Sequence, residues 1–270
     1  MNLLLSIGGE MIQIRAPDSV IGLLGQRFAR FANGHSRICS ANAIVIEIRS
    51  RTPTFPSSFE RSPKPRVSVS STGEITVEGT MTARYDLCAR RGLVEHAYNL
   101  GDVDTMLRLV LSIALPLGGA LLMHGAALNN PLFGAIALCG ESGAGKSTAA
   151  AALGAACDEL IVLRPENGTL HLYATPYWHG VPMCDVCQSV VCLLRGGEPA
   201  FAQQHGADAM RHLAHHVVRF VFTEPTERAI LRLLGLICKT TPVLTARCPE
   251  GDAFTPYLYK MLAQPLQAAA

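Results

Sequence analysis

The predicted fold is organised around the segment Gly140-Glu141-Ser142-Gly143-Ala144-Gly145-Lys146-Ser147-Thr148, which fits the phosphate-binding pattern G-x-x-x-x-G-K-[ST]. In this pattern the glycines let backbone N–H groups curl around phosphate oxygens, the lysine neutralises their charge, and the hydroxyl holds Mg²⁺. An apolar run of strand length, residues 134–139, precedes the segment, and the alanine-rich residues 148–156 favour a helix after it. A strand, a glycine-rich turn and a helix N-terminus together form an anion site, so the sequence predicts binding of a nucleoside triphosphate or another polyphosphate.

Composition narrows the classes of protein that this chain can belong to. With 270 residues it can hold one large domain or two modest ones, and 49% hydrophobic residues are typical of a globular protein. A net charge of +2 without a run of basic residues argues against a nucleic-acid partner. Nine scattered cysteines without a secretory signal indicate reduced thiols and a cytoplasmic location. The most apolar segment, residues 107–122, is interrupted by Pro116 and by glycines, which argues against a membrane span.

Residues 1–100 predict a small β-rich region with one early helix, which is either a recognition platform or plain scaffold. Apolar and β-branched runs indicate the strands, and residues 20–31 have apolar side chains at helical spacing. The proline- and serine-rich residues 51–65 predict a loop. The expected strands are residues 3–7, 11–14, 43–48, 67–69, 74–78 and 80–85.

Residues 101–270 predict an α/β nucleotide-binding domain. Asp102 is suited to capping a helix, and leucines follow it at helical spacing. Two amphipathic helices are expected near the end of the chain, separated by the breaker Glu224-Pro225, and the tail after Gln264 is expected to fray. The predicted helices are residues 102–115, 148–156, 208–220 and 227–238, and a last strand is expected at 242–246.

Asp158 and Glu159 are an adjacent pair of carboxylates that leads into an apolar strand, residues 160–163. Nucleotide enzymes use such carboxylates to hold Mg²⁺ and to accept a hydroxyl proton. Only residues 147–157 separate the pair from Lys146, which leaves room for one helix and a turn. This spacing disfavours an ordinary P-loop ATPase, in which further strands and helices come before the metal carboxylate. A solvated turn with two charges is the alternative interpretation.

These residues, in their order along the chain, resemble a known family. His124-Gly125, the segment 140–147 and Asp158-Glu159 look like the motifs of the HPr serine kinase/phosphorylase C-terminal domain and its HPr-kinase-like relatives. Residues 174–180 resemble the Thr-Pro-Trp-x-Gly segment of these relatives. The resemblance implies a phosphoenolpyruvate carboxykinase-like P-loop domain with a mixed sheet, and a kinase that phosphorylates a serine of a protein or peptide. Some relatives phosphorylate precursor peptides of natural products, including lasso peptides.

The resemblance also implies roles for single residues. Asp158 would be the catalytic base, His124 would lie near the transferred phosphate, and Lys146 would bind the β- and γ-phosphates. Ser147, Glu159 and Asp158 would hold Mg²⁺. The nucleotide, ATP or another nucleoside triphosphate, would lie on Gly140, Ser142, Gly143, Ala144, Gly145, Lys146, Ser147 and Thr148.

Some positions differ from HPr kinase. Glu159 replaces the second aspartate of the pair, Thr148 stands where HPr kinase has glutamate, and its second signature is missing. The missing signature argues against a phosphorylase activity and against HPr itself as the substrate. A small-molecule kinase, a nucleotide hydrolase, and a non-catalytic module that binds nucleotide or peptide are the alternatives. A homo-oligomer is among the states that the sequence allows.

The other candidate residues each have a structural interpretation as well as a functional one. From its apolar surroundings alone, His124 reads as a core histidine. His179, Cys184, Cys187 and Cys192 could supply half of a metal site, but the cysteines also read as small hydrophobes of a strand. His212 and His216 are spaced for one helix face, which we expect to be polar and half-exposed. Arg195 and Arg247 are candidate phosphate contacts or surface ion pairs.

Overall fold

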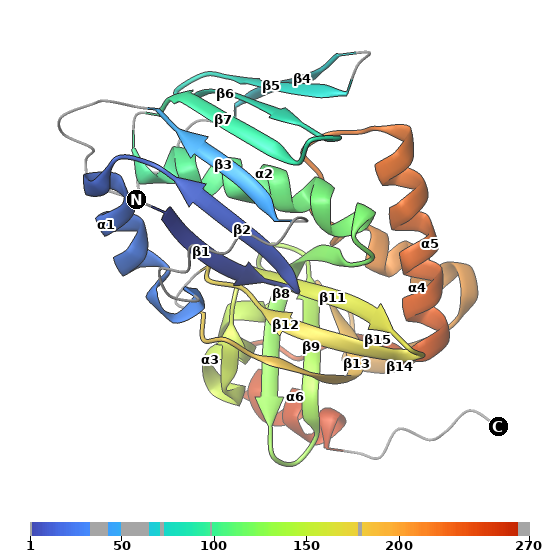
Figure 1. Ribbon diagram of the computed structural model, residues 1–270. Coiled ribbons are helices and arrows are strands. Elements are labelled where there is room, and N and C mark those ends of the chain that lie inside the picture. Colours follow the sequence, from blue (N-terminus) through green and yellow to red (C-terminus); the bar gives the residue numbers. More distant parts are fainter. Residues whose placement is uncertain are drawn as a thin grey trace. The chain divides into compact units, whose positions relative to one another are not determined.

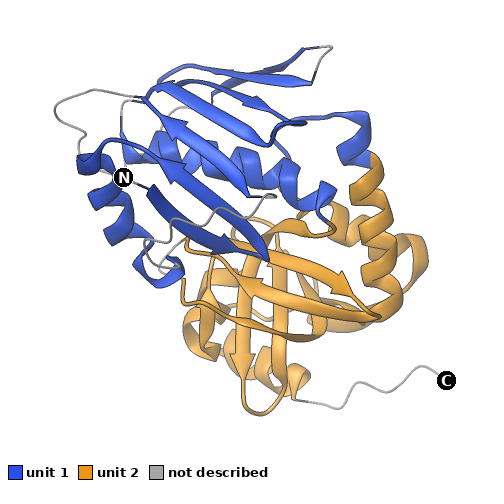
Figure 2. Cartoon of the chain, in the orientation of Figure 1, with its two compact units in different colours: residues 1–118, 219–227 blue, residues 119–218, 228–270 orange. Residues whose placement is uncertain are grey.

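The computed structural model describes residues 2–32, 43–49, 65–70, 73–97, 99–177 and 180–263. The chain forms two compact units: residues 1–118 with 219–227, and residues 119–218 with 228–270 (Figure 2). We call them unit 1 and unit 2. The sequence places a boundary near residue 100. The division differs because helix α2 (Leu100–Leu117) packs within unit 1.

Unit 1 contains a mixed seven-stranded sheet in the order β1-β2-β3-β7-β6-β5-β4 (Figure 1). The neighbours β2–β3 and β3–β7 are parallel, and the other pairs are antiparallel. Every strand expected here is present, and β7 is an addition. The strands are β1 (Asn2–Ile7), β2 (Glu10–Arg15), β3 (Ile44–Ile48), β4 (Arg66–Val69), β5 (Glu74–Glu78), β6 (Thr82–Asp86) and β7 (Arg91–His96). Most of the expected loop at 51–65 lies outside the described residues.

One face of this sheet packs on α2. Strand β6 alternates exposed and buried residues, as expected for a sheet with one covered face. A Cβ at Gly92 would lie only 3.0 Å from Met106 Cε of α2, so the strand and the helix approach closely there. Helix α1 (Asp18–Arg27) and a 3₁₀ turn (Ala29–Phe31) replace the single helix expected over residues 20–31.

Helix α2 begins at a capping box. The Asn99 side chain accepts from the Asp102 backbone N–H at 3.1 Å, and Asp102 Oδ2 accepts from the Asn99 N–H at 3.3 Å. The helix therefore starts before Asp102, which lies three residues after the cap. The Asp102 side chain also accepts from the Thr80 hydroxyl at 2.7 Å.

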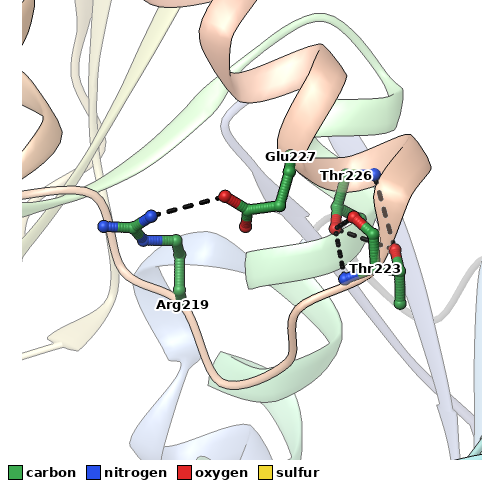
Figure 3. Close-up of polar contacts among 4 residues, drawn as sticks. All are labelled: Arg219, Thr223, Thr226 and Glu227. Atoms are coloured by element: carbon green, nitrogen blue, oxygen red, sulfur yellow. Dashed lines mark hydrogen bonds and ion pairs between the residues drawn. The ribbon is translucent and has the colours of Figure 1, made fainter.

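A reciprocal pair of threonines holds the start of helix α5 (Glu224–Thr240) (Figure 3). The Thr226 N–H lies 3.4 Å from Thr223 Oγ1, and the Thr223 N–H lies 3.3 Å from Thr226 Oγ1. Arg219 pairs with Glu227 at 3.4 Å. Pro225 lies in the first turn of α5, where its missing N–H removes no helical hydrogen bond, so Glu224-Pro225 begins this helix rather than separating two helices.

Among the described residues, unit 2 contains one eight-stranded sheet, in which β8 and β13 each pair with three other strands. The first residues of β8 pair with β11 and the later ones with β9, while β13 pairs with β12, β9 and β15. The β9–β13 and β13–β15 pairs are parallel, so the sheet is mixed. The strands are β8 (Leu121–Asn130), β9 (Gly134–Gly140), β10 (Ala155–Cys157), β11 (Leu160–Glu166), β12 (Thr169–Ala174), β13 (Cys184–Leu194), β14 (Ala200–Gln204) and β15 (Val243–Arg247).

The two faces of β8, β9 and β13 face different apolar cores. On one face, Leu128, Leu138 and Val191 pack with helices α3 (Lys146–Leu153) and α6 (Phe254–Leu262). On the other face, residues such as Met123 and Val190 pack with α4 (Gly206–Ala214), α5 and the β11–β12 hairpin. Because side chains alternate along a strand, even-numbered residues of β8 such as Leu128 face the first core, and odd-numbered ones such as Met123 face the second.

The predicted helices differ from the observed ones at their ends. The helix expected over residues 148–156 is α3, which ends at Gly154 in the left-handed conformation, and residues 155–157 form β10. The helix expected over 208–220 ends at Ala214, because the residues after it pair with β8. Among the described residues, no helix combines the length and the apolar character needed to cross a membrane.

Candidate functional site

Pairing across β9, β8 and β11 brings the main candidate segments together. Gly125 is opposite Cys139, so the strand end at Gly140 lies beside His124. On the other edge of β8, His124 is opposite Leu160, which directly follows Glu159. The glycine-rich loop (residues 140–148), His124 and the acid pair therefore lie side by side, where the C-terminal end of β9 and the N-terminal end of β11 meet the middle of β8.

The glycine-rich loop has a backbone that only glycine fits at two positions. Gly145 has φ +91°, and a Cβ there would lie 2.5 Å from the Phe254 ring. A Cβ at Gly140 would lie 2.9 Å from Leu193 Cβ. The loop leads into the N-terminus of α3, where unpaired backbone N–H groups favour an anion.

Lys146 is the first residue of α3 and is only 7 % exposed. Its ammonium donates to the backbone oxygens of Gly140 at 2.7 Å and Glu141 at 2.9 Å. Burial lowers the pKa of Lys146, and the nearby Asp158 carboxylate opposes this shift. Within the described residues Lys146 forms no ion pair. Its buried ammonium bonds to the backbone of the glycine-rich loop, at the place that an anion would occupy.

The acid pair lies in a strained turn between β10 and β11. Glu159 has φ +94°, an uncommon conformation for a residue with a side chain, and the cost of such a residue is about 1–3 kcal/mol. Asp158 Oδ1 accepts from the Glu159 N–H at 2.9 Å, and the Glu159 carbonyl accepts from the Gly125 N–H at 3.1 Å. Both side chains are half-exposed. The turn is fixed to β8, and its carboxylates remain accessible.

Thr175, in the segment that resembles Thr-Pro-Trp-x-Gly, supports this turn. It is fully buried, and its hydroxyl donates to the Leu160 carbonyl at 2.6 Å. A Cβ at Gly180 would lie 1.8 Å from the Thr175 carbonyl oxygen, so no other residue fits at position 180 without movement of the backbone. Trp178 and His179 lie outside the described residues.

His124 is half-buried beside both charged groups. Burial lowers its pKa, as does the Lys146 cation, whereas a hydrogen bond to the Glu159 backbone and the two carboxylates act in the opposite direction. Its ring thus lies between the glycine-rich loop and the acid pair. This placement differs from that of a core histidine surrounded by apolar side chains.

A cavity of about 800 Å³ lies against the loop. It is lined by Gly143, Gly145 and Thr148 of the loop, together with Arg195 and Phe254. Arg195 Nη1 lies 3.4 Å from the Ser142 carbonyl. The cavity has room for a nucleoside, with an aromatic ring and a guanidinium in its wall.

His216 joins the site, although the sequence places it on a helix face with His212. Helix α4 ends before it, and the His216 carbonyl accepts from the His124 N–H at 2.7 Å. It is 7 % exposed, whereas His212 is half-buried on α4. The position of His216 depends on pairing with a strand distant in sequence, so helical periodicity could not reveal it.

The other candidates lie elsewhere. Cys184 and Cys187 stand three positions apart on β13, and they differ in burial because alternate strand residues face opposite ways. Within the described residues no group of three His, Cys, Asp or Glu side chains is placed to hold a metal. Arg247 lies at the end of β15 and is exposed.

The donors present suit Mg²⁺ rather than a transition metal. Ser147 is exposed in the first turn of α3, and Asp158 acts electrostatically on the adjacent Lys146. Hydroxyl and carboxylate oxygens are the ligands that Mg²⁺ prefers, and it usually takes few protein ligands along with water and phosphate oxygens. The residues therefore fit a Mg²⁺–polyphosphate complex.

Of the comparisons with known proteins, the one with solved structures gives a match. No family model matches the sequence, and no curated protein is similar to it. Among solved structures, the Hpr(Ser) kinase/phosphatase from Coxiella burnetii matches with a TM-score of 0.29 and 15% identity. The match covers 52% of this chain and 92% of that chain. At this TM-score the match carries no weight for fold or function, so the functional assignment depends on the residues described above.

Proposed function

We propose that this protein is an ATP-dependent kinase that transfers phosphate to a serine hydroxyl of a peptide or protein. The observation that carries the proposal is the arrangement around His124 of β8, where β9 ends and β11 begins. A buried lysine on a glycine-rich loop lies beside a histidine and an accessible pair of carboxylates. Phosphoryl transfer needs positioned groups and charge stabilisation of this kind.

In this proposal the nucleoside occupies the cavity beside Phe254 and Arg195, and the phosphates extend over the loop toward Lys146. The Lys146 ammonium leaves its two carbonyl partners and binds the β- and γ-phosphate oxygens. Backbone N–H groups of the loop and the N-terminus of α3 bind the remaining phosphate oxygens.

Asp158 then acts on the acceptor. Its carboxylate takes the proton of the serine hydroxyl while the hydroxyl oxygen bonds to the γ-phosphorus. The bond from that phosphorus to the β–γ bridging oxygen breaks, and ADP leaves. Ser147, Asp158 and Glu159 would hold Mg²⁺, which would neutralise charge on the phosphates.

The choice of a peptide or protein acceptor follows from the resemblance of the sequence motifs to HPr-kinase-like proteins. Small-molecule phosphorylation, nucleotide hydrolysis and nucleotide binding without catalysis are the competing outcomes, and one assay separates them. The protein is incubated with γ-labelled ATP, Mg²⁺ and serine-containing peptides or proteins, and label is followed in peptide, free phosphate and ATP.

The Asp158→Asn variant tests the role of the carboxylate. We expect nucleotide affinity to stay within about twofold, while the transfer rate falls about 10²- to 10⁴-fold, which is the usual contribution of a general base. Glu166→Gln, at the far end of β11, is the matched control and should retain full activity. Equal transfer by Asp158→Asn would refute the role of Asp158, and label that appears only in free phosphate would favour a hydrolase.

A further inference from the structure

The segment after helix α4, residues 216–218, pairs with β8 along the part of its edge that β9 does not cover. The His216 carbonyl accepts from the His124 N–H at 2.7 Å, and the Val218 N–H donates to the Leu122 carbonyl at 2.9 Å. Val217 forms an antiparallel bridge with Met123 between these bonds. His216 therefore stands directly opposite His124 in a short antiparallel pair.

The alternation of side chains along a strand shows which side of the sheet the two histidines face. Met123 and Val217 belong to the core formed with α4 and α5. Their neighbours along each strand must face the opposite side, which carries α3. Residues opposite each other in an antiparallel pair share one face, with Cβ atoms roughly 5 Å apart. The His124 and His216 rings therefore face the side of the sheet on which Lys146 begins its helix.

The environment of the His216 ring is polar, nearly closed and cationic. Burial lowers its pKa to about 4, and Lys146, His124, His215 and His212 contribute in the same direction. Its imidazole is therefore neutral near pH 7 and carries one N–H donor. Within the described part of the chain, its ring nitrogens make no hydrogen bond to protein. The ring nitrogens are therefore available to a ligand that enters the site.

The residues around the site indicate which way the phosphates of a bound nucleotide would extend. The cavity suited to the nucleoside is lined by the loop on the side of Gly143 and Thr148. His124, His216 and Asp158 do not line that cavity, and both histidines interact with Lys146. A polyphosphate that extends from the cavity across Lys146 reaches the histidines with its terminal group.

We propose that His216 donates a hydrogen bond to the terminal phosphate of a bound nucleoside triphosphate and so makes the site selective for triphosphate over diphosphate. The assignment rests on the proposed nucleotide binding by the glycine-rich loop. His124 faces the acid pair, and His216 is the second imidazole of the same face.

Calorimetric titration of the full chain with Mg²⁺–ATP and Mg²⁺–ADP tests this assignment. We expect His216→Ala to weaken ATP binding about tenfold, in line with loss of a hydrogen bond to a charged group, and to leave ADP binding unchanged. His216→Gln retains an N–H donor and should recover part of the ATP affinity. His215→Ala changes the adjacent but exposed histidine and should bind both nucleotides like the unaltered protein.

An NMR measurement on the unaltered protein tests the same assignment if the alanine variant does not fold. The ¹⁵N resonances of the His216 ring, assigned from the spectrum of His216→Gln, should shift with ATP and not with ADP. Equal loss of ATP and ADP affinity, or no loss, would overturn the role of His216. ATP binding without transfer to any acceptor would overturn the kinase proposal alone, because the ATP-to-ADP comparison does not require turnover.

Discussion

Buried polar groups are treated differently in the two units. In unit 1, charges inside the fold meet opposite charges: Arg90 pairs with Glu10, and Arg27 pairs with Asp104. In unit 2, within the described residues, Lys146 is more deeply buried and bonds only to backbone oxygens, and the His216 ring has no hydrogen-bond partner. Breaking a buried ion pair destabilises the fold because it leaves one charge unpaired, whereas a buried cation that forms no ion pair is available for an anionic ligand. The comparison assigns a structural role to the charges of unit 1 and a binding role to those of unit 2.

Removing the Lys146 charge should produce the largest effect. We expect Lys146→Met to lower the affinity for Mg²⁺–ATP at least about a hundredfold, because bonds from an ammonium to phosphate oxygens are lost. Thermal unfolding without ligand should be unchanged or shifted upward, since the variant removes a buried cation that forms no ion pair among the described residues. A large loss of stability in the ligand-free protein would contradict the binding role.

Acid should destabilise the protein through His216. Its pKa is about 4 in the folded protein and 6.5 as the ordinary value, so below pH 6.5 the unfolded chain takes up a proton that the folded chain resists. The free energy of unfolding should therefore fall by about 2–3 kcal/mol between pH 6.5 and pH 4 and then level off as far as this group is concerned. Urea unfolding across this range should show the fall in the unaltered protein and in His215→Ala. His216→Gln should show a smaller one.

Breaking a pair in unit 1 should affect stability alone. Glu10→Gln leaves the partly buried Arg90 without its carboxylate, which should cost about 2 kcal/mol in the free energy of unfolding. The exposed pair Arg49–Glu47 provides a control, and Glu47→Gln should leave stability nearly unchanged. A change in nucleotide affinity by either variant would contradict the separation of roles.

The strained turn should give the smallest effect, and its direction is informative. Glu159→Gly relieves the positive φ, so it should be more stable than Glu159→Ala by about 1 kcal/mol. Both variants lack the carboxylate and should lose Mg²⁺-dependent phosphate transfer to a similar degree. Thermal unfolding and the labelled-ATP assay measure the two effects separately. Greater stability of the alanine variant would mean that the turn is not strained.

Local patterns predicted a large part of both units. The β-branched residues 44–48 form β3, and the apolar run before Gly140 forms β9 with α3 directly after the loop. The predicted neighbours Lys146, His124 and Asp158-Glu159 do lie together. Their roles in binding and transfer stay predictions until nucleotide is tested.

The first error comes from contacts between distant segments. Residues 215–218 continue the helical periodicity of α4, but the free edge of β8 offers hydrogen bonds that helix propensity cannot outweigh. The second error has a local cause: Pro225 has the sequence signature of a breaker but lies in the first turn of α5, where Thr223 and Thr226 on either side of it cap the helix.

By itself the sequence determined the α/β class, the glycine-rich loop with its flanking strand and helix, and the acid pair. These features depend on residues within a few positions of one another, where backbone conformation and spacing decide the outcome. Only the tertiary structure decided that α2 belongs to unit 1, that Thr175 supports the acid turn, and that His216 faces Lys146 beside His124. Each of these depends on which strand edges pair and which faces are covered, and pairing between distant segments leaves no periodic signal in the sequence.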